Sequence, residues 1–158
     1  MKTASVKELK NELTYRSQAE LVELCLRLSK FKKENKELLT YLLFESSDED
    51  AFIRGVKEEI DRDFAMINTK SYFYIKKSVR KILRNTKKYI RYSKKKETEV
   101  ELLLYFCEKL KEMQPSYKNN VSLDNIFNRQ IVTIKKAIAT LHEDLQFDYG
   151  LELEELEN

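Results

Sequence analysis

The sequence is poor in the residues that make tight turns. It has two glycines and one proline among 158 residues, whereas average usage is about 7% for glycine and about 5% for proline. Hairpins between β-strands normally need such residues at their turns. We therefore predict an all-α fold of six or seven helices, paired as antiparallel hairpins in a compact bundle or a short α-solenoid.

Histidine is almost absent as well, and this scarcity excludes several kinds of catalytic site. His142 is the only histidine, so one chain cannot supply a paired-histidine zinc site or the histidines of a di-iron bundle. The glycines, Gly55 and Gly150, are too far apart to form a phosphate-binding loop. Carboxylates at 58–63 alternate with basic residues, and we interpret them as solvated helix charges. We predict a protein that is not an enzyme and has no metal or other cofactor.

Long apolar runs and a disulfide framework are also missing. No run approaches the length of about 18 residues that a membrane span requires, and the start, MKTASVKEL, has no apolar signal core. Cys25 and Cys107 each stand among apolar residues, where we expect reduced thiols in a helical core. These features predict a cytoplasmic protein without a membrane span.

Several short signals predict where helices begin. Ser5 with Glu8, and Ser17 with Glu20, have the form of capping boxes. The helix after Ser17 has apolar residues on more than one side, so we expect it to be central, and we expect a turn near 32–35.

Further along, the serines and carboxylates of 46–50 predict another helix start. Gly55 lies in that helix and suggests a crossing backbone. We expect a break at Asn68–Thr69 and a loop over 114–121. Between them, residues 97–113 are apolar on more than one side and predict a second central helix. Ser122 should begin a last helix that runs to a glycine C-cap at Gly150. We predict one domain over 1–150 and a short acidic tail over 151–158.

Residues 70–96 are the most distinctive stretch. Between Phe64 and Lys96 there are twelve lysines and arginines and no acidic residue, and the rest of the chain carries a net charge of −9. Helical spacing places the cations on one face of a long helix and Ile75, Val79 and Ile82 on the opposite face. The candidate binding residues are Lys76, Lys77, Arg80, Arg84, Lys87, Lys88 and Arg91.

Two interpretations of this basic face remain open. The face is either an exposed surface neutralised by acidic neighbours, including the stretch 143–158, or a surface that follows the phosphates of a nucleic acid or another polyanion. Tyr74 and Tyr92 flank it and would then stack on bases. Binding to a membrane surface fits less well, because the apolar side of this helix is needed for the core.

The first 110 residues resemble a family of small, all-helical bacterial proteins known only as a domain of unknown function. The likeness is carried by Val6-Lys7-Glu8-Leu9, Ala19-Glu20-Leu21-Val22-Glu23-Leu24, 33–37 and 76–82. This resemblance implies a cytoplasmic helical domain and no active site. Together with the patterns above, it predicts a non-catalytic interaction or scaffold module with an unknown protein partner or self-association, and as the alternative a nucleic-acid-binding protein.

Overall fold

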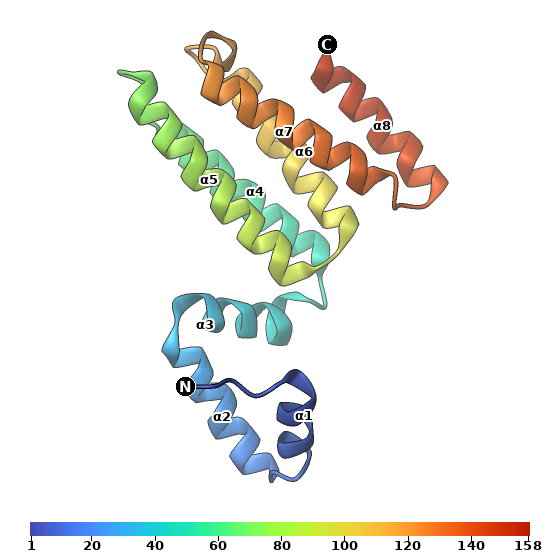
Figure 1. Cartoon of the computed structure of the whole chain (residues 1–158). Helices are drawn as coiled ribbons and strands as arrows, with labels where there is room; N and C mark the ends of the chain where they lie inside the picture. The colour runs from blue at the N-terminus through green and yellow to red at the C-terminus, as the bar shows by residue number, and fades with distance from the viewer. The chain divides into compact units, whose positions relative to one another are not determined.

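The computed structural model describes all 158 residues as eight α-helices with no β-strand (Figure 1). It confirms the all-α class, with slightly more helices than the six or seven predicted. The chain forms two compact units, Met1–Phe44 and Glu45–Asn158. The sequence predicted one domain over 1–150, whereas the structure divides the chain between Phe44 and Glu45. No helix is both long and apolar enough to cross a lipid bilayer.

The first unit contains α1 (Val6–Thr14), α2 (Gln18–Phe31) and α3 (Lys33–Thr40), which leads into a π-helical turn over Tyr41–Glu45. Both predicted capping boxes are present, because the hydroxyls of Ser5 and Ser17 accept from the N–H groups of Glu8 and Glu20. The predicted turn is a single extended residue, Lys32, between α2 and α3.

The helices of this unit leave most of their apolar side chains exposed. We expected α2 to be central, but Val22, Leu28 and Phe31 are all exposed, as are Val6 and Leu9 on α1. The cysteine of α2, Cys25, is exposed too. The prediction was wrong because apolar spacing shows which face of a helix favours burial, not whether another helix covers it.

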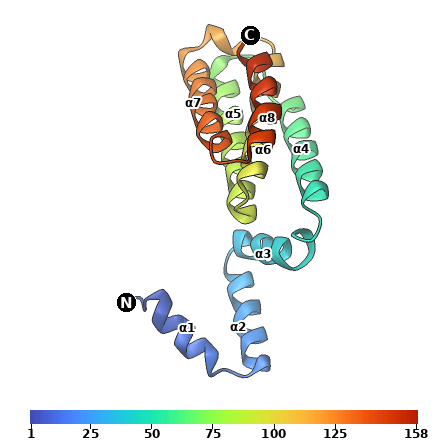
Figure 2. The same ribbon diagram turned by 90° about the vertical axis from the view of Figure 1, so that its right-hand side faces the viewer.

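The second unit consists of α4 (Glu49–Ala65), α5 (Tyr72–Ser93), α6 (Lys96–Glu112), α7 (Val121–Ile138) and α8 (Glu143–Glu157), with a 3₁₀ turn at Tyr117–Asn119. Helix α6 lies at the centre and contacts each of the other four (Figures 1 and 2). Its side chains Leu102, Phe106 and Cys107 are fully buried, which confirms the prediction that this helix is central.

Hydrogen bonds tie the start of α4 to the junction between α5 and α6. One carboxylate oxygen of Glu49, Oε1, accepts from the hydroxyls of Ser93 and Thr98, the latter at 2.8 Å. The other oxygen lies 3.3 Å from Nζ of Lys95. The side chain of Asp48, rather than a serine, caps α4. Lys94 ends α5 in the left-handed region with φ of 58°, so the predicted helix 70–96 is shorter at both ends.

The C-terminal part differs most from the expectation. The predicted helix from Ser122 to Gly150 is two helices, because the N–H groups of Thr140 and Leu141 bond three residues back and tighten the last turn of α7. His142 then caps α8 through Nδ1, which accepts from the N–H of Asp144 at 3.3 Å. Asn120, not Ser122, caps α7.

Helix α8 continues through Gly150, so this glycine is not a C-cap, and the predicted tail over 151–158 is helical to residue 157. Leu153 and Leu156 are buried, which explains why this acidic segment is ordered. The prediction for Gly55 was also wrong: nothing lies within 4 Å of the position that a Cβ would take there, so no backbone crosses it.

Candidate polyanion-binding groove

The two faces of α5 are as different as the sequence predicted. Ile75, Val79 and Ile82 are buried, while Arg80 and Arg84 are exposed on the opposite side. The helix is apolar toward the core and cationic toward solvent, so the burial of its apolar face presents the charges outward.

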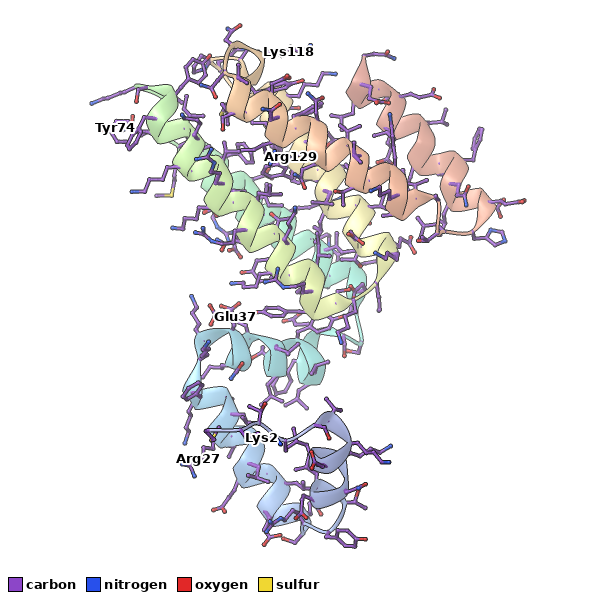
Figure 3. The ribbon with its side chains drawn as sticks, in the orientation of Figure 1. Lys2, Arg27, Glu37, Tyr74, Lys118 and Arg129 are labelled. Atoms are coloured by element: carbon purple, nitrogen blue, oxygen red, sulfur yellow. The ribbon has the colours of Figure 1, made fainter.

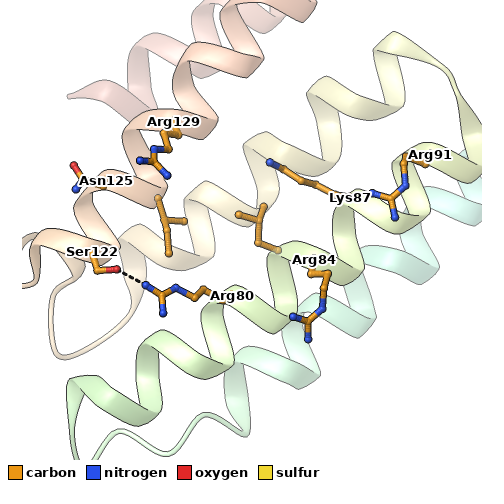
Figure 4. A pocket seen from close by; sticks show the side chains of 9 residues that line it. Arg80, Arg84, Lys87, Arg91, Ser122, Asn125 and Arg129 are labelled. Carbon is orange, nitrogen blue, oxygen red and sulfur yellow. Dashed lines mark hydrogen bonds between the residues drawn. The ribbon is translucent and has the colours of Figure 1, made fainter.

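A groove of about 550 Å³ lies between α5 and α7 (Figure 4). One wall is α5 and the other is the first half of α7, and the two helices run in the same direction in Figure 1. Five cationic side chains and no carboxylate line this α5–α7 groove. Its lining residues are Arg80, Leu83, Arg84, Lys87 and Arg91 from α5, and Ser122, Asn125, Ile126 and Arg129 from α7.

The cations from α5 follow one face of the helix. Arg80, Arg84, Lys87 and Arg91 follow one another at steps of four and three residues, which corresponds to rises of about 4.5 to 6 Å along a helix. Arg129 faces them from α7 (Figure 4). A linear ligand lying in the groove would therefore meet positive charge from both walls.

One hydrogen bond connects the two walls. The guanidinium of Arg80 donates from Nη2 to the hydroxyl of Ser122 at 2.7 Å, shown as a dashed line in Figure 4. None of the five cations forms an ion pair with a carboxylate. Their charges are thus available to a ligand.

The structure brings four of the seven predicted binding residues together: Arg80, Arg84, Lys87 and Arg91. Lys76, Lys77 and Lys88 lie outside the groove, and the ammonium of Lys88 is 4.9 Å from the ring centroid of Tyr89.

The contribution of α7 to the groove, from Ser122, Asn125 and Arg129, was not predicted from the sequence. Their spacing of three and four residues places them on one face of a helix, but no signal in the sequence showed that this face would lie opposite α5.

One of the two aromatic residues proposed to stack on bases is not available. Tyr92 is buried, with its ring edge-on to Tyr89 at a centroid distance of 6.0 Å. Tyr74 is exposed near the start of α5 (Figure 3). The helical wheel placed both rings beside the cations, but Tyr92 packs against Tyr89, which itself contacts Phe52 of α4.

The acidic C-terminal segment does not neutralise the groove. Helix α8 packs against α6 and α7, at the opposite edge of the unit from α5 in Figure 1. There Glu157 pairs with Lys135, and the ammonium of Lys111 donates to the carbonyl oxygens of Glu155 and Leu156 at 3.1 and 3.0 Å. The interpretation that residues 143–158 cover the basic face is therefore wrong.

Carboxylates gather instead between α6 and α8. Glu108, Glu112, Glu152 and Glu155 line a second groove of about 510 Å³ there, together with Lys111. Burial and the neighbouring carboxylates raise the pKa of both Glu108 and Glu152, although nearby lysines oppose this shift. These two grooves thus have opposite charge.

Two of the four carboxylates at 58–63, Glu59 and Asp61, have structural partners. Asp61 accepts from the hydroxyl of Tyr105 at 2.8 Å and pairs with Lys109 at 3.3 Å. Glu59 accepts from the hydroxyl of Tyr89 at 2.8 Å. Nowhere in the chain do three or more histidine, cysteine or acidic side chains form a group that could hold a metal ion.

Comparison of the chain with family models, with curated proteins and with solved structures gave no match. The resemblance to a helical bacterial family therefore stays a prediction.

Proposed function

We propose that this chain is a non-catalytic helical binding module that holds the phosphate backbone of a nucleic acid in the α5–α7 groove. The observation that carries the proposal is the set of five cations on two facing walls, none of which has an acidic partner.

The electrostatics of the row support an anionic ligand. Two unit charges about 6 Å apart repel by about 0.7 kcal/mol even at the dielectric constant of water. Arg80, Arg84, Lys87 and Arg91 share one face of α5, so their like charges repel one another. A polyanion that occupies the groove removes this repulsion and releases its own counterions, which favours binding.

The uncharged residues of the groove suit the same ligand. Asn125 and Ser122 are hydrogen-bonding groups, of the kind that contact phosphate and sugar oxygens alongside arginine and lysine. Arginine presents a planar fork of donors that matches two phosphate oxygens at once, and four of the five cations are arginines.

The test is a binding titration with a fluorescent oligonucleotide, followed by anisotropy at low salt. The variant Arg84→Gln/Lys87→Gln/Arg129→Gln removes three charges from the groove and should bind much more weakly. A matched control, Arg54→Gln/Arg62→Gln/Lys81→Gln, removes the same numbers of exposed arginines and lysines outside the groove. Equal weakening in both variants, or no binding by the unaltered protein, would contradict the proposal.

A second candidate function is protein binding by Met1–Phe44, including self-association. The specific observation is the exposure of apolar side chains along α1 and α2, among them Val6, Leu28 and Phe31. Light scattering over a range of concentrations should then show a dimer, which Leu28→Lys/Phe31→Lys converts to a monomer. A monomer at every concentration tested would contradict self-association.

A further inference from the structure

An exposed aromatic ring extends the row of cations toward the start of α5. Phe73, Lys77, Arg80, Arg84, Lys87 and Arg91 follow one another at steps of four, three, four, three and four residues, so they share one face of the helix. The side chain of Phe73 is 68% exposed. It is thus an apolar surface in line with the positive charges.

The ring of Phe73 is held in place from its own helix. It lies edge-on to the ring of Tyr74, with a centroid distance of 5.5 Å and an interplanar angle of 79°. The preceding residue, Tyr72, donates its hydroxyl to the carbonyl oxygen of Ser116 at 2.9 Å, which fixes the start of α5 against the loop before α7. One face of the Phe73 ring can therefore receive another flat group without a rearrangement of the backbone.

The groove itself also offers apolar surface. Leu83 from α5 and Ile126 from α7 line it between the cations. A phosphate group does not pack favourably against apolar side chains, whereas the sugar and base of a nucleotide do. One further cation, Lys118, is exposed on the 3₁₀ turn near the end where α5 begins (Figure 3).

From this arrangement we infer that the ligand of the α5–α7 groove is a single-stranded nucleic acid, with its backbone along the cations and a base stacked on Phe73. The inference rests on the proposed function. A duplex keeps its bases stacked inside and has no free base face to offer within the strand, while single-strand-binding surfaces combine a cationic groove with aromatic rings.

The experiment compares three probes with equal numbers of phosphates: a single strand, a blunt-ended duplex without a loop, and a strand that lacks bases. The single strand is tested both as DNA and as RNA, because the two polymers offer the same phosphates and stacking bases, and the comparison distinguishes them. The single strand should bind the unaltered protein more tightly than either of the other two probes.

Phe73→Leu should weaken binding of the single strand by about tenfold, which is typical for loss of one stacked base. It should leave the base-free strand unaffected. Phe73→Tyr keeps the ring and should retain affinity. The matched control is Phe147→Leu on α8, because Phe147 is 67% exposed and lies outside the groove.

The outcomes separate the inference from the proposed function. If the duplex binds as tightly as the single strand, or if Phe73→Leu has no effect, the inference is overturned while the nucleic-acid function stands. If no nucleic acid binds and an acidic polypeptide such as polyglutamate does, both are overturned. Phe73 is exposed, so its variants should unfold at the same temperature as the unaltered protein, and circular dichroism checks this.

Discussion

Removing one cation from each wall of the α5–α7 groove tests whether a ligand lies between the walls. For single strands, the logarithm of the binding constant falls with the logarithm of salt concentration by about 0.7 for each phosphate contact. Five cations line the groove, which predicts a slope of about −3.5. A fourfold rise in salt should then weaken binding by about 100-fold.

Arg84→Gln on α5 and Arg129→Gln on α7 should each reduce the slope to about −2.8. The weakening over the same fourfold rise in salt should fall to about 50-fold. The assay is anisotropy of a labelled single strand at several salt concentrations. Lys81→Gln, an exposed cation of α5 outside the groove, is the control and should leave the slope unchanged.

The result for Arg129→Gln decides whether the ligand lies in the α5–α7 groove or along an external surface of α5. A slope that changes for Arg84→Gln and not for Arg129→Gln would mean that the ligand follows the outer face of α5 alone. Slopes unchanged in both variants would refute the assignment of these cations as phosphate contacts.

Three further predictions concern the stability and reactivity of the chain. Glu49→Ala should lower the free energy of unfolding by about 2 to 4 kcal/mol in thermal denaturation, because two nearly buried hydroxyls lose their acceptor. Glu108→Gln should raise the melting temperature at neutral pH and have little effect below pH 4. The reason is that burial raises the pKa of Glu108 in the folded chain. The contribution of Glu108 to stability is therefore full below its pKa in the unfolded chain and is lost as pH rises through its pKa in the folded chain. A thiol reagent at about pH 8 should modify Cys25 and spare Cys107, because burial raises the pKa of Cys107 to about 12.

Each of these predictions has a conservative control. Glu49→Gln retains one acceptor oxygen and should cost less than Glu49→Ala. Glu154→Gln, at an exposed position of α8, should not reproduce the pH-dependent stabilisation. Cys25→Ser should abolish the rapid thiol reaction, and a rapid reaction that persists in this variant would contradict the burial of the other cysteine.

Signals contained within a few residues correctly predicted the starts of the first two helices. Ser5 and Ser17 cap α1 and α2 as expected, because a capping box is complete within four residues. The basic helix was also predicted, since the periodicity of α5 extends over many turns and needs no knowledge of other helices.

Features that depend on the packing of distant segments were not predicted. The spacing of Ile138, Leu141 and Leu145 continues a helical pattern across the break between α7 and α8, and no glycine or proline marks that break. Arg129 has no local sign of a binding role. Arg129 lines the groove because α6 holds α7 alongside α5, and a single sequence does not reveal this arrangement.

The separation of opposite charges onto two edges of the Glu45–Asn158 unit gives this part of the molecule an electric dipole moment. The arginines of one edge and the carboxylates beside α8 on the other produce a torque in the field of any approaching polyanion. If a polyanion is the ligand, this field turns the α5 edge forward before contact and acts on the rate of encounter rather than on the lifetime of the complex.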